Sequence, residues 1–284
     1  MKEKKNLILV NKELLEEKDV FISRNDRGYQ FGDGVYEVIK IYNGEMFTSK
    51  EHINRLYESA RKIQLTIPYE NDELIGMLKN LMKVNQLKDG HIYMQITRGV
   101  AERIHQFPEN GTEAVLTAYT KEMDRPLEKQ SKGVKVTLVE DERWFKCDIK
   151  SLNLLANVLA KQEATVKGSY EAILHRGETV TEGSASNVFG IKDDVLYTHP
   201  ATNRILHGIT RKVVLDIADL NGLVIKEKAM TVKELLEMDE LFLTSTTSEV
   251  MPIIQVDEQK VNGGKIGKWT KGLQREFEKL VKEL

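Results

Sequence analysis

The chain has one cysteine, Cys147, so an internal disulfide is excluded. Its six histidines show no HExxH spacing, and no CxxC pair occurs, so the sequence predicts no metal site. It has no apolar run long enough to form a membrane-spanning helix. The opening segment has an apolar core of only LILV, which is too short for a secretory signal. We therefore expect a cytoplasmic protein without a metal.

An excess of one charge is also missing. The 42 basic and 44 acidic residues nearly cancel and leave a formal charge of -2. Such a balance gives no broad basic surface for nucleic acid or anionic lipid, so the expected partners are small molecules or proteins. With 284 residues, 40% of them hydrophobic, the chain is long enough to build a large core in one or two domains.

Periodicity predicts mixed elements in the N-terminal part. Asn43 and Gly44, between alternating residues, favour a tight hairpin. Apolar residues at helical spacing indicate a helix over 49–65. The elements expected before residue 121 are strands at 6–14, 36–48, 90–99 and 113–121 and helices at 49–65 and 71–87.

The charged stretch 121–133 contains Pro126 and shows no period, so we interpret it as a linker between a small domain, 1–120, and a larger one, 134–284. Helices and strands continue after it without strict alternation, which favours an α/β (mixed α+β) pair of domains over a barrel of repeated units. The elements expected there are strands at 134–140, 170–176, 186–192, 195–199, 224–229 and 239–246 and helices after Lys150 and at 209–222, 231–238 and 267–284.

Two N-terminal segments have features that packing does not require. Glycines punctuate residues 26–40 without the GxGxxG spacing of a dinucleotide site, so this segment is an ordinary loop or a close backbone approach, and Tyr36 after it is a core or a site residue. Arg103 and His105 lie two positions apart, so in extended chain both side chains can reach one carboxylate. A solvated loop is the alternative reading.

Two C-terminal segments combine an acid or hydroxyl groups with element ends. Glu182 precedes small hydroxyl residues, and HGIT at 207–210 stands where a helix should begin, so Ile209 and Thr210 are placed to bind a phosphate. Thr210 as a plain helix cap remains the alternative. Thr246, at the end of a strand, is a further phosphate donor or part of an ordinary turn.

Lys150 stands just ahead of the apolar run SLNLLANVLA. A lysine amine becomes a nucleophile when burial or a nearby positive charge favours its neutral form, and this position predicts partial burial. A lone lysine is usually idle. Here, however, an imine-forming amine, an acid, a phosphate-binding helix start and a carboxylate receptor occur together, and these are the parts required for pyridoxal-phosphate chemistry on an amino acid.

The runs EGSASNVF at 182–189, LYT at 196–198 and LHGITR at 206–211 resemble the signature of the class IV (fold type IV) pyridoxal-phosphate aminotransferases. The resemblance extends over essentially the whole chain, and within the family it points to enzymes acting on D-amino acids. It implies a small N-terminal α/β domain, a larger C-terminal pseudo-barrel domain, and a homodimer in which the carboxylate-binding Arg and His come from the neighbouring subunit.

The same resemblance implies the site roles. Lys150 forms the Schiff base and moves the proton, and Glu182 faces the pyridine nitrogen. Arg55 pairs with the phosphate, whose other oxygens meet the groups at Ile209, Thr210 and Thr246, and Leu206 packs on the ring. Tyr36, Arg103 and His105 form the carboxylate trap. Ala185 departs from the family pattern, where a third serine is expected, and this puts the hydrogen bonds of that loop in doubt.

The implied reaction transfers the amino group of D-alanine or another D-amino acid to 2-oxoglutarate by a ping-pong mechanism, giving D-glutamate, a peptidoglycan precursor. Three rivals share the scaffold: branched-chain L-amino-acid aminotransferase, aminodeoxychorismate lyase and (R)-amine transaminase. The Arg103 and His105 segment favours the D-specific reading over each. A binding protein without the cofactor is the remaining alternative, and the presence of Lys150, Glu182 and Arg55 argues against it.

Overall fold

A computed structural model describes residues 6–108 and 112–284. The first residues of the opening segment and the far end of the 97–111 loop lie outside the described residues. The chain divides into two compact units, one made of residues up to 124 together with 149–153, the other of residues 125–148 and 154–283. Within the described ranges, no helix is both long and apolar enough to span a membrane.

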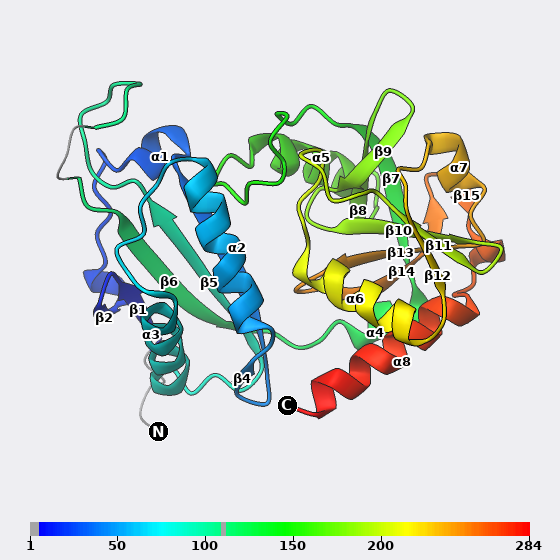
Figure 1. Ribbon diagram of the computed structural model, residues 1–284, viewed down its shortest axis with the longest axis horizontal. Helices are drawn as coiled ribbons and strands as arrows, with labels where there is room; N and C mark the ends of the chain where they lie inside the picture. The colour runs from blue at the N-terminus through cyan, green and yellow to red at the C-terminus, as the bar shows by residue number, and fades with distance from the viewer. Residues whose placement is uncertain (1–5, 109–111) are drawn as a thin grey trace. The chain divides into compact units, whose positions relative to one another are not determined.

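The N-terminal unit is a six-stranded antiparallel sheet in the order β2-β1-β6-β5-β3-β4, with α2 and α3 packed on it (Figure 1). Inward-facing Ile39, Ile92 and Leu116 pack with Leu56 and Leu78 of the helices and form its core. Its elements are β1 (Leu7–Val10), β2 (Glu13–Glu16), α1 (Arg27–Phe31), β3 (Gly34–Tyr42), β4 (Glu45–Met46), α2 (Ser49–Lys62), α3 (Asn71–Val84), β5 (Gly90–Thr97) and β6 (Val115–Glu122).

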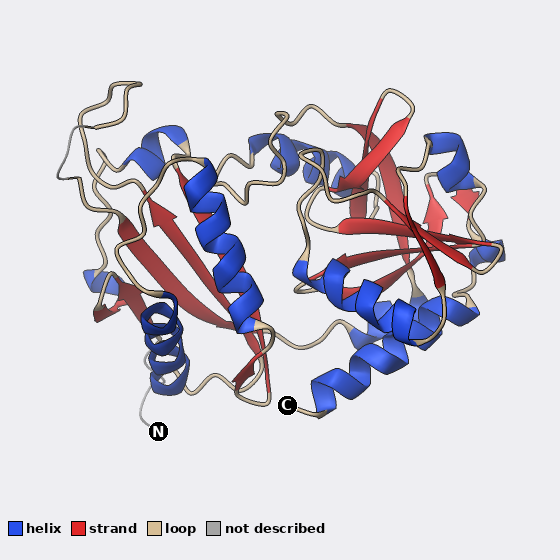
Figure 2. Cartoon of the chain, viewed as in Figure 1, coloured by secondary structure: helices blue, strands red, loops and turns tan. Residues whose placement is uncertain are grey.

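The C-terminal unit is built on a mixed sheet in the order β12-β11-β10-β13-β14-β7-β8-β9, with β15 added to β14. The last strand in this order, β9, also contacts β10, the third strand from the other end, so the sheet curls into a half-barrel (Figure 2). Its elements are α4 (Leu127–Lys132), β7 (Val134–Glu140), α5 (Leu155–Val166), β8 (Glu171–Arg176), β9 (Thr179–Gly183), β10 (Asn187–Lys192), β11 (Val195–Thr198), α6 (Ile209–Leu220), β12 (Val224–Glu227), α7 (Val232–Leu236), β13 (Glu240–Ser245), β14 (Glu249–Val256), β15 (Gln259–Lys260) and α8 (Lys268–Lys282).

The predicted fold class, a mixed α/β fold with a small N-terminal sheet and a C-terminal half-barrel, is confirmed. The Asn43-Gly44 hairpin is also as predicted: both residues have positive φ, and Tyr42 pairs with Glu45 across the turn. The expected single strand at 6–14 is instead a hairpin, β1 and β2, because Asn11 adopts a positive φ and turns the chain.

Two segments expected to be irregular contain helices. The 26–40 loop includes α1, which Asp26 caps by accepting a hydrogen bond from the Gly28 N–H at 2.7 Å. The stretch 121–133, expected as a linker, holds the end of β6 and the helix α4, so four residues, 123–126, separate the two elements. Pro126 does not break α4, because it stands at the N-cap position, where no helical N–H is needed.

Candidate active site

Lys150 lies in an irregular segment along the edge of β3, in which the Ser151 N–H donates to the Ile149 carbonyl at 2.8 Å. The helix we expected directly after it begins only at Leu155. The Tyr36 N–H donates to the Lys150 carbonyl at 3.0 Å, and Ser151 bridges to Val35. From the other side, the Lys150 N–H donates to the Ser59 hydroxyl at 3.1 Å. The open hydrogen-bonding groups of this strand edge therefore hold 149–153 in the N-terminal unit, although we expected the lysine in the C-terminal domain.

The side chain of Lys150 is half-buried, as its position before an apolar run predicted. Its Nζ lies 4.2 Å from the centroid of the Tyr36 ring, so the amine faces an aromatic surface. The structure thus brings together two of the residues predicted for the site. Both are fixed by the same pair of backbone segments, which leaves the lysine side chain as the movable part.

Arg55, on α2, is held by a buried carboxylate. Glu37 of β3 is completely buried and accepts hydrogen bonds from Arg55 Nε at 2.6 Å and Arg55 Nη2 at 2.9 Å. His52 Nδ1 lies 2.8 Å from the same carboxylate. Burial alone would raise the pKa of Glu37, but the charge of Arg55 and the hydrogen bonds from His52 and Arg55 outweigh it and hold that pKa far below its usual range. Burial also lowers the pKa of His52, so the ring is neutral near pH 7 and donates to Glu37.

Replacing Glu37 with glutamine should destabilise the N-terminal unit by about 3 kcal/mol, because it leaves the charge of Arg55 without its buried partner. Chemical denaturation of the cofactor-free protein measures this loss in the free energy of unfolding. Glu45→Gln, at an exposed position of the neighbouring hairpin, is the matched control and should change it by less than about 0.5 kcal/mol. Equal stabilities for the two variants would contradict the prediction.

Arg103 and His105 are exposed on the loop after β5. The Arg103 guanidinium carbon lies 5.1 Å from the Phe31 ring centroid, and the His105 ring packs edge-on against the same ring, with 5.8 Å between centroids. Tyr36 instead stacks with Tyr93 at 5.8 Å. Among the described residues, Arg103 and His105 therefore share the Phe31 ring as a contact, while Tyr36, the third residue predicted for the carboxylate trap, stacks on a different ring.

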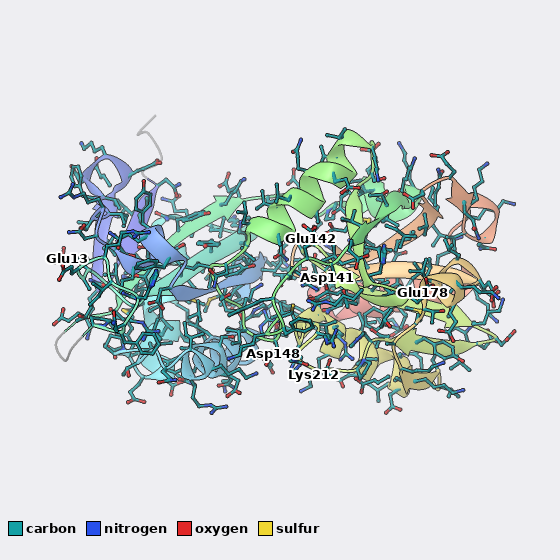
Figure 3. The ribbon with its side chains drawn as sticks, turned by 90° about the horizontal axis from the view of Figure 1, so that it is seen from above. Glu13, Asp141, Glu142, Asp148, Glu178 and Lys212 are labelled. Carbon is teal, nitrogen blue, oxygen red and sulfur yellow. The ribbon has the colours of Figure 1, made fainter. Side chains whose placement is uncertain are left out.

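Glu182 is the penultimate residue of β9 in the C-terminal unit and is buried. It accepts hydrogen bonds from Arg143 Nη1 at 2.6 Å, from Asn187 Nδ2 at 3.0 Å and from the Leu206 N–H at 3.0 Å. Arg143 in turn pairs with Asp141, which follows β7 and is labelled in Figure 3. The predicted residues Glu182 and Leu206 are therefore in direct contact, and three chain segments converge on one carboxyl group.

Burial raises the pKa of Glu182 to about 7, and the charge and hydrogen bond of Arg143 offset this only in part. The folded protein then binds more protons than the unfolded chain between pH 4.5, the ordinary value, and about pH 7. The free energy of unfolding should therefore fall as pH rises through this window, by up to about 3 kcal/mol, and stay constant with respect to this group above it.

Chemical denaturation of the cofactor-free protein at several values from pH 5 to pH 8 tests this dependence. Glu182→Gln should flatten the decline, while Glu142→Gln, at an exposed position nearby, should leave it unchanged. If the free energy of unfolding of Glu182→Gln declined with pH by the same amount, the decline would come from another titrating group.

The first turn of α6 begins at Ile209, as HGIT predicted, and Thr210 is buried within it. Gly208 occupies the N-cap, where no side chain caps the free N–H groups. A Cβ at this glycine would come within 2.0 Å of Asn187 Oδ1, so only glycine allows the helix start to approach the Glu182 cluster this closely. No side chain caps this helix start, so its N–H groups beside the buried acid are able to bind an anion.

Thr246 lies in the turn between β13 and β14 and is half-buried. The strand that leads into this turn, β13, packs against α6 and pairs with β10, where Thr244 is opposite Asn187. The predicted phosphate residues Ile209, Thr210 and Thr246 thus belong to neighbouring elements of one unit, while Arg55 belongs to the other unit.

The serines after Glu182 are bound within the protein. The Ser184 hydroxyl donates to Glu171, a buried residue of β8, and the Ser186 hydroxyl donates to the same carboxylate at 3.3 Å. Ala185 between them is exposed. A serine at position 185 would point outward in this conformation, so the departure from the family pattern leaves the network around Glu171 intact.

Several residues that hold the predicted site residues in place were not predicted from the sequence. All of them have a buried polar or charged side chain that bonds to a predicted site residue or to the partner of one. They are Glu37, His52, Asp141, Arg143 and Asn187. The alternation of inward- and outward-facing residues along β3 is a signal for Glu37, because it places this charged residue on the buried face between apolar residues. For Arg143 no comparable signal exists, because its partner Glu182 is 39 positions away.

Comparison with known proteins agrees with this geometry. The model of the amino-transferase class IV family matches residues 34–256. D-Alanine aminotransferase of Staphylococcus aureus (strain COL) is 50% identical over 274 residues, 96% of this chain and 97% of that protein. The D-alanine aminotransferase of Listeria monocytogenes (strain 10403S) is 50% identical over 272 residues, 95% and 94% of the two chains.

Two solved structures have the same fold. The Escherichia coli branched-chain amino acid aminotransferase superposes with a TM-score of 0.90 at 25% identity, covering 98% of this chain and 95% of that one. The T.th. branched-chain amino acid aminotransferase, solved with pyridoxamine 5′-phosphate, superposes with a TM-score of 0.91 at 27% identity, covering 98% and 94%. With the family model covering most of the chain, and with half of all residues shared with D-alanine aminotransferases, this protein belongs to the class IV aminotransferase family.

Proposed function

We propose that this protein is a D-amino-acid transaminase that moves the amino group of D-alanine, and of other D-amino acids, to 2-oxoglutarate. One observation carries the choice within the family. Identity with D-alanine aminotransferases is 50%, about twice the 25% and 27% shared with branched-chain aminotransferases of the same fold. The likeness to the branched-chain enzymes is mainly one of backbone, whereas the likeness to D-alanine aminotransferases extends to half of the side chains.

The residues of this chain fit pyridoxal 5′-phosphate, the cofactor of the family. An uncapped helix start at Ile209 suits the phosphate, and Arg55 supplies a cation for it. Glu182, a carboxyl with a pKa near neutrality, suits a pyridine nitrogen that must hold a proton. When bound, this cofactor supplies an electron sink that stabilises the carbanion formed at the substrate Cα.

The residues of the site then have distinct roles. Lys150 would hold the cofactor through Nζ, and its amine would move the proton released at the substrate Cα. Tyr36 orients the amine from its ring face. Glu182 keeps the proton on the ring nitrogen, and Arg143 and Asn187 fix its carboxyl group. Leu206, whose N–H binds the same carboxyl, would pack on the ring.

We further propose a cytoplasmic homodimer in which Arg103 and His105 of one subunit bind the substrate carboxylate in the site of the other. Two observations support this arrangement. Both side chains are exposed in the isolated subunit. In addition, α5 has a strip of apolar side chains that are each more than half exposed: Leu155, Val158 and Leu159. Contacts between subunits commonly cover a surface of this kind. A measured solution mass of one chain would refute the dimer.

A panel of amino donors with 2-oxoglutarate tests the function. The purified protein loaded with pyridoxal phosphate should transaminate D-alanine and show little activity with L-leucine. The reverse preference would identify a branched-chain L-amino-acid aminotransferase, and formation of 4-aminobenzoate and pyruvate from aminodeoxychorismate would identify the lyase.

A further inference from the structure

The segment that carries Arg103 and His105 has little structure of its own. Between Ala101 and Pro108 it forms no helix or strand, and Ile104, between the two cations, is substantially exposed. One backbone hydrogen bond lies within the segment, from the Ile104 N–H to the Glu102 carbonyl at 2.9 Å. Two side chains that must meet one carboxylate need a firmer support than this.

The support comes from a buried arginine. Arg27, at the start of α1, is 3% exposed, and its Nη1 donates to the Ile104 carbonyl at 2.8 Å. Its Nε donates to Asp33 Oδ2 at 2.8 Å, so one planar guanidinium joins the loop backbone to a fixed acid. The Arg27 N–H also donates to the Gly99 carbonyl at 2.9 Å, which holds the entry of the same loop.

Asp33 is itself anchored to the body of the unit. Arg98 binds it through two hydrogen bonds, from Nε at 2.8 Å and Nη2 at 2.9 Å, and donates to the carbonyls of Ile63 and Gln64 at the end of α2. Burial opposes the charge of Asp33, but the hydrogen bonds of Arg98 and Arg27 outweigh it and lower its pKa. The chain of contacts from α2 to the loop is therefore charge-assisted at each step.

Phe31 connects Arg27 with both cationic side chains. Its ring centroid lies 4.8 Å from the Arg27 guanidinium carbon, 5.1 Å from that of Arg103 and 5.8 Å from the His105 ring centroid. A single aromatic ring thus contacts the arginine that holds the backbone and the two side chains that the backbone carries. Moving the ring would move both of them.

We propose that Arg27, with Phe31, is the positioning residue of the carboxylate trap: it holds the segment 103–105 so that Arg103 and His105 point at one substrate carboxylate. This inference rests on the proposed function, since it takes the trap as the binding site of the amino acid. In this proposal, Arg27 affects substrate binding although it does not contact the substrate. The alternative is that the cluster only stabilises the N-terminal unit.

Steady-state kinetics of the holoenzyme separates the two readings. Arg27→Gln should raise the KM for D-alanine about 10-fold or more while kcat changes less than about 3-fold. The inhibition constant of propionate, a carboxylate without an amine, should rise by the same factor as KM, and the Kd of pyridoxal phosphate should stay as in the wild type. Arg24→Gln, an exposed arginine three positions earlier, is the control and should change none of these.

A double variant gives the second measurement, because the effects of Arg27→Gln and Arg103→Gln on KM should not add. In an Arg103→Gln background, Arg27→Gln should raise KM by a smaller factor than it does in the wild type, because one of the two residues through which it acts is already removed. Phe31→Leu leaves the Arg27, Asp33 and Arg98 contacts in place, so it tests the proposal if Arg27→Gln fails to fold, and it should raise KM in the same direction. Arg27→Lys, which keeps the charge, should restore part of the affinity.

A wild-type enzyme that does not transaminate D-alanine would refute the proposed function. If the wild type does so but Arg27→Gln and Phe31→Leu keep the wild-type KM, only the positioning role is refuted. Losses from Arg27→Gln and Arg103→Gln that simply add would also overturn it, since they would show that Arg27 acts independently of the trap.

Discussion

Replacing Lys150 with alanine should lower kcat for transamination of D-alanine by about 10⁴-fold or more, because it removes both the covalent anchor and the base that acts at Cα. The structure gives the reason for so large an effect. Hydrogen bonds to Tyr36 and Ser59 fix the Lys150 backbone, so alanine at this position leaves no amine where Nζ lies against the Tyr36 ring. Single-turnover measurements with D-alanine, followed as pyruvate formed, would quantify the loss.

Lys146 provides the matched control, because it is four positions away and exposed. Lys146→Ala should keep wild-type turnover. After borohydride reduction of the loaded wild-type enzyme, the cofactor should be found on the peptide that contains Lys150, and it should be found on no peptide of Lys150→Ala. Label on a different lysine of the wild type would refute the assignment.

Glu182→Gln should lower kcat by about 10²- to 10³-fold, since the neutral amide cannot hold a proton on the ring nitrogen through the developing charge at Cα. The amide can keep contacts with Arg143 and the Leu206 N–H, so the fold around it should remain. The effect is therefore expected on turnover and not on the affinity for the cofactor's phosphate.

Two further variants sharpen this prediction. Glu182→Asp keeps the charge on a shorter side chain and should recover part of kcat. Arg143→Gln removes a cation that lowers the pKa of Glu182, so this pKa should rise further and the acidic limb of the pH profile should move upward. A Glu182→Gln enzyme with wild-type kcat would contradict the role of the acid.

Local patterns in the sequence predicted local structure well. The Asn43-Gly44 hairpin needs only the preference of these two residues for positive φ, and the start of α6 at Ile209 follows from a glycine before an apolar period. The position of Lys150 was predicted less well. Its apolar neighbours suggested a helix, but residues 149–153 form hydrogen bonds with the edge of β3, more than 100 positions earlier in the chain, and are not helical.

The residues predicted for the site stand in recognisable motifs, while the residues that hold them in place do not. Glu182 stands in a distinctive run, but its partner Arg143 lies in a stretch without any pattern. The carboxylate of Glu37 and the guanidinium of Arg55 are 18 positions apart on different elements, so only the packing of α2 on the sheet reveals the pair. Ion pairs between distant segments leave no periodic trace in one sequence.

The membership of residues 149–153 in the N-terminal unit limits how the protein can be divided. A fragment ending at Asp124 would lose the segment that hydrogen-bonds to Gly34 and Tyr36, and would expose an unpaired strand edge that can recruit other chains. A fragment beginning at Arg125 would carry the lysine without its support. Neither piece is a workable module, so gene fusion, domain exchange or circular permutation must keep both units in a single polypeptide.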